Sequence, residues 1–164
     1  MKKYGLLCGR FQPLHLGHVS LIHKALSECD ILAVAVGSAQ HQAHYCDKNP
    51  YSYSIRASML ERCFKEEISS GRLVYFPVND INNPPKWVEH VVSCCHPDSL
   101  AQKLNTYFAG SSSDAQLFID KGFFTIILDR STSSYKSGTE LRTLIRENNL
   151  SWRNYVPEEI WSLL

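Results

Sequence analysis

Short apolar stretches alternate with amphipathic stretches along the chain. Unbroken apolar runs are typical of strands covered on both faces, whereas apolar residues at intervals of three and four indicate helices. The pattern predicts strands at Tyr4–Cys8, Ile31–Val36, Leu73–Phe76, Thr106–Ala109 and Thr125–Leu128. It predicts helices at Leu16–Ser27, Ser54–Ser69, Trp87–Cys95, Asp114–Lys121, Gly138–Asn148 and Pro157–Leu164. The polar segments predict loops at Gly37–Tyr53, Asp80–Pro85 and Asp129–Lys136.

This alternation predicts an α/β fold. We expect a Rossmann-like doubly wound sheet of about five parallel strands flanked by helices, with right-handed crossovers. The 164 residues fit one domain. In such sheets ligands bind beyond the carboxyl ends of the strands, where the strand order reverses. The loop after the first strand should lie there.

Composition narrows the function classes. The chain is 44% hydrophobic and 20% charged, as expected for a globular protein with a real core. A net charge of +1 gives no basic field for a nucleic acid, and no apolar run approaches the ~20 residues of a membrane span. We therefore expect neither a nucleic acid nor a membrane as a partner.

Six cysteines are present without a C-x-x-C pair or a zinc-ligand spacing. Free thiols fit a reducing compartment, which predicts a cytoplasmic location. We expect Cys8 to be a small buried hydrophobe, and Cys94 and Cys95 to be thiols at a helix end.

Residues 9–18 read Gly-Arg-Phe-Gln-Pro-Leu-His-Leu-Gly-His, between the first strand and the first helix. Backbone N–H groups and the positive end of a helix dipole suit a phosphate at such a junction. His15 and His18 share a helix face, and Gly17 between them lets a ligand approach closely. With Arg10 they indicate a triphosphate site. The alternative is a loop with two surface histidines.

Three further segments should meet at the same edge of the sheet. They are Gly37–Gln40, with Lys48–Pro50 in the same loop, then Asp80–Trp87, and finally Ser137–Arg142. In the last segment, hydroxyl and N–H groups can hold a phosphate, and Arg142 shares a face with Thr139. Ser137 or Thr139 could also be only a helix cap. Paired with residues 9–18, we interpret the segment as the second half of a phosphate clamp.

These motifs resemble a known family. The run at residues 9–18 and the Ser-Gly-Thr-Glu-Leu-Arg segment resemble the nucleotidyltransferases of the His-x-Gly-His superfamily. Gly37–Gln40, Asn49-Pro50, Pro77–Ile81 and Trp87-Val88 resemble the archaeal-type nicotinamide mononucleotide adenylyltransferases. The resemblance spans nearly the whole chain and implies a single nucleotidyltransferase domain over residues 1–164. It also implies transfer of AMP from ATP to nicotinamide mononucleotide (NMN), giving NAD and pyrophosphate.

The resemblance assigns roles to individual residues. The catalytic residues would be His15, His18 and Arg142. The ATP-binding residues would be Gly9, Arg10, Phe11, Gly17, Lys48, Ser137, Gly138 and Thr139. The NMN-binding residues would be Gly37, Ser38, Asp80, Ile81 and Trp87, the last stacking on the nicotinamide ring. A packing role in the core is the alternative for Trp87. Mg²⁺ would travel with ATP without a protein metal site, and we expect a homo-oligomer.

The chemistry suits this allocation, because the second pKa of a phosphate monoester is about 6 and the attacking dianion needs no general base. The protein then has to position the reactants and stabilise charge during direct in-line attack. The chain departs from the family at three positions, with Lys48 for an arginine, Ile55 for a glutamate and Ser111 for an asparagine.

Two other functions remain open. The acceptor could be another phosphate, such as phosphopantetheine, a sugar phosphate, or glycerol phosphate with CTP. The chain could also be a nucleotide-sensing module without turnover.

Overall fold

The computed structural model describes residues 2–42, 46–128 and 134–164. Its centre is one parallel sheet of five strands in the order β3-β2-β1-β4-β5. The strands are β1 (Tyr4–Gly9), β2 (Ile31–Val36), β3 (Leu73–Pro77), β4 (Thr106–Ala109) and β5 (Phe124–Ile127). The predicted fold class is therefore confirmed, and the strand order reverses at β1.

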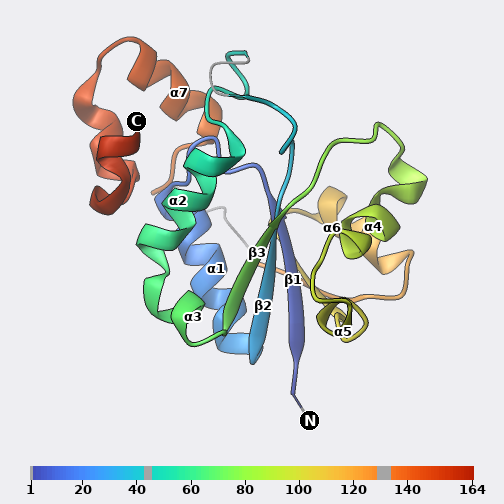
Figure 1. Ribbon diagram of the computed structural model, residues 1–164. Coiled ribbons are helices and arrows are strands. Elements are labelled where there is room, and N and C mark those ends of the chain that lie inside the picture. Colours follow the sequence, from blue (N-terminus) through green and yellow to red (C-terminus); the bar gives the residue numbers. More distant parts are fainter. Residues whose placement is uncertain (1, 43–45, 129–133) are drawn as a thin grey trace.

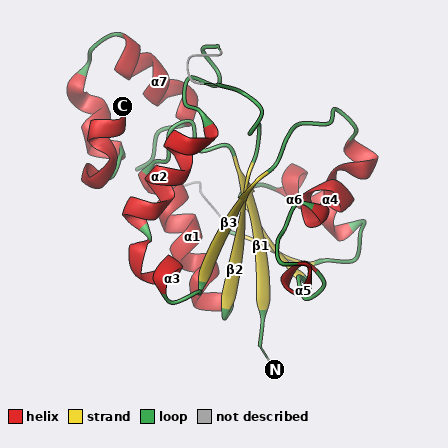
Figure 2. Cartoon of the chain, in the orientation of Figure 1, coloured by secondary structure: helices red, strands yellow, loops and turns green. Residues whose placement is uncertain are grey.

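Helices cover both faces of the sheet (Figures 1 and 2). One side carries α1 (Leu16–Glu28), α2 (Tyr53–Cys63), α3 (Lys65–Ser69) and α7 (Gly138–Arg146), with the 3₁₀ helices at Leu150–Tyr155 and Glu158–Leu163. The other side carries α4 (Pro84–Ser93), α5 (Asp98–Ala101) and α6 (Ser112–Ile119). None of these described helices is both long and apolar enough to cross a bilayer.

The apolar run of β2 shows why the sheet must be covered twice. Leu32, Val34 and Val36 belong to one buried cluster, and Ala33 and Ala35 belong to the other. Successive side chains of a strand point to opposite faces, so an unbroken apolar run feeds two cores.

Some predicted helices have different bounds. The helix expected at Ser54–Ser69 is divided at Phe64, where the backbone leaves the helical region while the side chain is fully buried in the core. The helix expected at Pro157–Leu164 is a 3₁₀ helix, and α5 and Leu150–Tyr155 were not predicted. Part of the loop expected at Asp129–Lys136, residues 129–133, lies outside the described residues.

The cysteines follow the prediction with one exception. Cys94 caps the end of α4 and Cys95 is buried, as expected of thiols at a helix end. Cys8 is only partly buried, because it lies near the open carboxyl end of β1 and lines the cavity described below.

Candidate active site

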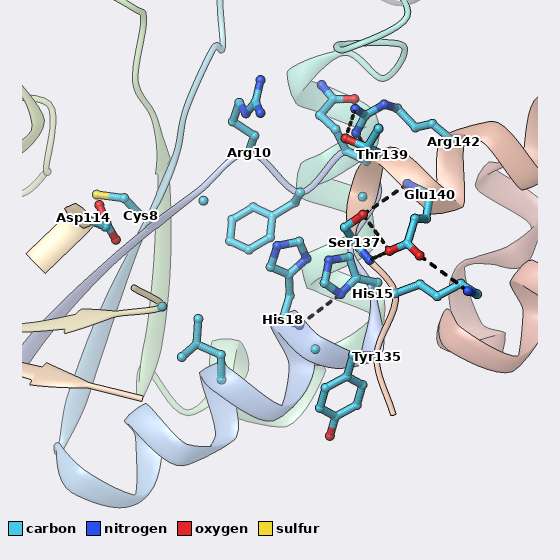
Figure 3. Close-up of a pocket in the computed structure, with 18 of the residues that line it drawn as sticks. Cys8, Arg10, His15, His18, Asp114, Tyr135, Ser137, Thr139, Glu140 and Arg142 are labelled. Atoms are coloured by element: carbon cyan, nitrogen blue, oxygen red, sulfur yellow. Dashed lines mark hydrogen bonds and ion pairs between the residues drawn. The ribbon is translucent and has the colours of Figure 1, made fainter. Parts of the chain in front are cut away.

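A cavity of about 550 Å³ opens beyond the carboxyl end of β1 (Figure 3). Its walls come from β1 and the loop that follows, the first turn of α1, the start of α6, and the first turn of α7. The predicted residues among its lining are Gly9, Arg10, Phe11, His15, Gly17, His18, Ser137, Gly138, Thr139 and Arg142. The structure therefore brings the first and last motifs together, although they are more than 100 residues apart in sequence.

The first loop folds around Phe11. Its φ is 52°, in the left-handed region, and its ring is buried against Gly9. A Cβ on Gly9 would lie 2.6 Å from that ring, so the position needs a glycine. The Phe11 ring also meets the His18 ring edge-on, with centroids 5.0 Å apart. Phe11 thus packs against His18, one of the predicted catalytic residues.

The two histidines stack on each other at the start of α1. Their ring centroids are 3.7 Å apart and the rings are inclined by 25°. His15 caps the helix, because its Nδ1 accepts a hydrogen bond from the backbone N–H of His18 at 3.4 Å. A Cβ on Gly17 would come within 3.0 Å of the His15 ring. The side chain of His15 is only 7% exposed, and this burial excludes the alternative of a loop with two surface histidines.

The last motif opens α7 with a capping box. Ser137 Oγ accepts from the backbone N–H of Glu140, and the Glu140 carboxylate accepts from the backbone N–H of Ser137 at 2.8 Å. Hydrogen bonds from Ser137 lower the pKa of Glu140, and Lys136 Nζ lies 3.6 Å from that carboxylate. The cap predicted as an alternative is real, and it turns the start of α7 towards the cavity.

Arg142 joins the two motifs. Its guanidinium donates to the carbonyl oxygen of Gln12 at 2.8 Å and to Thr139 Oγ1 at 3.1 Å. Burial, and then the nearby charge of Arg10, lower the pKa of Arg142. Both arginines line the cavity and their charges repel each other, which favours a multiply charged anion there.

The second and third predicted segments lie next to each other. Gln40 donates to the Asp80 carboxylate at 3.0 Å and accepts from the backbone N–H of Asp80 at 3.1 Å. The backbone N–H of Gly37 donates to the carbonyl of Gly9 at 2.9 Å, which ties this pair of loops to the first motif.

The remaining predicted residues lie outside the cavity that holds the histidines. Gly37, Ser38, Lys48, Asp80, Ile81 and Trp87 do not line the cavity that holds the histidines. Trp87 lies in the first turn of α4, half-buried, and packs against the core cluster on that side of the sheet. The structure thus supports the packing role for part of the ring while leaving the rest accessible.

Arg56 was not among the predicted site residues, although the whole arrangement depends on it. This arginine of α2 is fully buried and donates to the carbonyls of Arg10 at 2.8 Å, Gly37 at 2.6 Å and Ser38 at 3.0 Å. Burial lowers its pKa to about 10, so it stays charged at neutral pH. The sequence offers one indication that Arg56 is buried. It precedes the core residues Met59 and Leu60 by three and four positions, which puts it on the apolar face of the helix.

Gln12 was also missed. Its side chain is buried and exchanges two hydrogen bonds with the backbone of Tyr51, at 2.8 and 2.9 Å. Asp114, Tyr135 and Lys136 line the cavity without having been predicted. Within the described part of the chain, no group of three or more His, Cys, Asp or Glu side chains is placed to hold a metal ion.

Comparison with known proteins identifies the family to which the chain is similar. Residues 6–108 match the cytidylyltransferase-like family model. The chain is 35% identical over 161 residues to the nicotinamide-nucleotide adenylyltransferase of Thermococcus kodakarensis, covering 98% of this chain and 81% of that protein. It is 33% identical to the enzyme of the same name from Thermococcus onnurineus, again over 98% of this chain and 81% of that protein.

The fold also matches a solved structure. A bifunctional NMN adenylyltransferase/ADP ribose pyrophosphatase from Francisella tularensis, complexed with AMP and a manganese ion, superposes with a TM-score of 0.76. The sequences are 23% identical, and the match covers 95% of this chain and 44% of that chain. The present chain therefore spans less than half the length of that bifunctional protein.

Proposed function

The chain belongs to the nicotinamide-nucleotide adenylyltransferases, within the cytidylyltransferase-like family, and we propose that it transfers AMP from ATP to NMN to form NAD and pyrophosphate. The observation that carries this proposal is the single cavity shared by the histidine motif and the start of α7. We also propose that residues 1–164 act as one nucleotidyltransferase domain, since both core clusters are built on the same sheet.

We propose the following division of labour in the reaction. A phosphate oxygen of NMN attacks the α-phosphorus of ATP, and the bond from that phosphorus to the bridging oxygen of pyrophosphate breaks. His15 and His18 donate hydrogen bonds to the phosphate oxygens on which charge develops. Thr139 and Arg142 hold the outer phosphates, together with Arg10 and the backbone of Gly9–Phe11, Ser137 and Gly138. No general base is needed.

The acceptor side rests on the adjoining loops. We propose that Gly37, Ser38, Asp80 and Ile81 bind NMN, with the nicotinamide ring on the accessible part of Trp87. The Gln40–Asp80 hydrogen bonds support this, because they hold the loops after β2 and β3 together at the same end of the sheet. Lys48 is proposed as an additional contact to ATP.

Mg²⁺ enters this scheme as part of the ATP substrate, because it prefers phosphate oxygens and water over an all-protein site. Chelation of the metal should abolish turnover, and added Mg²⁺ should restore it. We further propose that the enzyme works in the cytoplasm, as its free thiols suggest.

The deciding experiment is turnover with ATP and Mg²⁺, read by product mass and pyrophosphate release. NMN should give NAD. Parallel reactions contain nicotinic acid mononucleotide, phosphopantetheine, a sugar phosphate, or glycerol phosphate with CTP. If one of the last three compounds is turned over faster than NMN, that compound's class is the acceptor and the NMN assignment is wrong. Tight ATP binding without pyrophosphate release from any acceptor would identify a sensing module.

A further inference from the structure

Arg56 lies between the backbones of the two proposed substrate regions. It belongs to the first turn of α2, which starts near the loops that follow β1 and β2 (Figure 1). Its side chain is fully buried. Among the described residues, each hydrogen bond that its guanidinium donates ends on a backbone carbonyl. Arg56 can therefore act on the substrates only through the backbone that it holds.

The four carbonyls come from both substrate regions and from α2 itself. Nη1 of Arg56 donates to the carbonyl of Arg10, in the proposed ATP loop, and to that of Gly37, in the proposed acceptor loop. Nη2 donates to the carbonyl of Ser38 at 3.0 Å, and Nε donates to that of Ser52 at 3.3 Å. A guanidinium is planar and rigid. One rigid group therefore fixes the separation of the two loops.

Each of these loops contains a strained turn beside its bond to Arg56. Phe11 has a φ of 52° and Ser38 a φ of 51°, in the left-handed region that is costly for residues other than glycine. The carbonyl of Arg10 belongs to the peptide that enters Phe11, and the carbonyls of Gly37 and Ser38 flank Ser38. The guanidinium thus holds both turns in conformations that persist only where the surrounding structure supports them.

The charge of Arg56 offers a second route to the same loops. Burial lowers its pKa to about 10, while the nearby charge of Asp80 opposes this fall and that of Arg10 adds to it. The side chain therefore remains a cation at neutral pH, within reach of a charged residue in each substrate region. Lysine keeps this charge but lacks the planar fork, so it separates an effect of charge from an effect of geometry.

We propose that Arg56 is a positioning residue for adenylyl transfer, which holds the loops after β1 and β2 at the separation that in-line attack requires. The inference rests on the proposed function, in which the first loop binds ATP and the second binds NMN. A misplacement of about 1 Å between reacting groups can cost roughly 100-fold in rate. Each loop alone still binds its own substrate. A change at Arg56 therefore lowers kcat more than it weakens the binding of either substrate.

The test is Arg56→Lys, with kcat for NAD formation measured at saturating ATP, NMN and Mg²⁺. Isothermal titration with each substrate separately gives the two Kd values. We expect kcat to fall roughly 10–100-fold while each Kd changes by less than about threefold. A residue that only stabilises the fold does not produce this split between kcat and binding.

Met59→Ala is the matched control. Met59 lies three residues further along α2 and is fully buried in the core cluster. The cavity left by the alanine should lower the midpoint of thermal unfolding, as Arg56→Lys also should. Below that midpoint, kcat of Met59→Ala should equal that of the unaltered protein. Arg56→Gln, which supplies N–H donors without a charge, is the second variant and should show the same split as Arg56→Lys.

Several outcomes overturn the inference without touching the proposed function. Unchanged kcat in folded Arg56→Lys would refute positioning, and a loss confined to Arg56→Gln would assign the effect to charge. Weaker binding of one substrate at normal kcat would limit Arg56 to a single loop. An equal fall of kcat in Met59→Ala, or failure of both Arg56 variants to fold, would make the role purely structural.

Failure of the proposed function has a different signature. The unaltered protein would then form no NAD from NMN, whatever residue stands at position 56. If another acceptor is turned over, the same comparison of kcat with Kd is made with that acceptor. If no acceptor is turned over, the inference about Arg56 is wrong together with the proposed function.

Discussion

The ring of His18 is packed between His15 and Phe11 at the first turn of α1. We expect His18→Ala to keep the fold and to lower kcat for NAD formation by roughly 10²–10³, the usual loss for one transition-state donor. His23→Ala, on the exposed side of the same helix, is the control. Full activity in a folded His18→Ala protein would refute the assignment.

Arg142 bridges Gln12 and Thr139, so its guanidinium is already oriented before ATP arrives. Arg142→Ala should raise the KM for ATP roughly 10–100-fold, because charge-assisted hydrogen bonds contribute about 1.5–3 kcal/mol each. Steady-state kinetics on both substrates measures this. The control is Arg146→Ala, one turn further along α7, where the side chain pairs with Asp47. A defect in NMN binding alone would show that Arg142 contacts NMN and that its assignment to ATP is wrong.

At this scale the sequence was a good guide to the residues that line the cavity and a poor guide to the residues that support them. His15, His18, Thr139 and Arg142 belong to compact motifs whose residue types carry the chemistry. Arg56 and Gln12 act on backbone carbonyls and N–H groups of distant loops, and those partners are visible only after folding.

At the scale of the elements, Arg56 of α2 holds the loops after β1 and β2 together through hydrogen bonds to their carbonyl groups. Arg56→Met should lower the free energy of unfolding by about 3 kcal/mol or more, because it leaves buried carbonyls without donors. Urea denaturation measures the change. Arg56→Lys keeps the charge but cannot form the guanidinium fork, so it should be intermediate. Unchanged stability in both variants would show that water replaces the guanidinium.

The helix α4 carries the acceptor assignment through Trp87. Stacking of an indole on a pyridinium ring is worth roughly 0.5–2 kcal/mol. Trp87→Ala should therefore raise the KM for NMN severalfold or more while the KM for ATP changes little. NMN should also quench a fluorescence component that Trp87→Phe removes, although Trp152 and Trp161 remain. An unfolded variant with no defect specific to NMN would make Trp87 a core residue.

The central strand β2 was predicted at its observed bounds because burial on two faces favours an unbroken apolar run, whereas the exposed edge strand β5 begins and ends one residue earlier than predicted. The helices were harder, since Phe64 is apolar at the spacing of a continuing helix and yet ends α2 by turning into the core. The short α5 and the 3₁₀ turns have too few residues to show a period.

At the scale of the whole molecule, the strand order reverses at β1, and the two proposed substrate regions lie on either side of that strand. The sheet could be predicted from the alternation of strands and helices. The separation of the proposed acceptor loops from the cavity with the histidines could not, because it depends on which side of β1 each strand joins.

We also expect the protein to form a homo-oligomer. The edge strand β5 leaves Phe124 69% and Ile127 51% exposed, and apolar side chains at a sheet edge favour association. Sedimentation velocity should show more than one copy, and Phe124→Lys should weaken the assembly. Leu150→Lys, at an exposed apolar position elsewhere, is the control. A monomer at every concentration would contradict this.

The bond between Arg142 and Gln12 joins residues 130 positions apart. During synthesis on the ribosome, β1 and the stacked histidines are made early, and α7 follows only after all five strands. A nascent chain therefore lacks half of the proposed phosphate clamp until all five strands have been made. ATP can stabilise the finished molecule, but it has no complete site on which to guide the early steps of folding, and the sheet must assemble through its own apolar contacts.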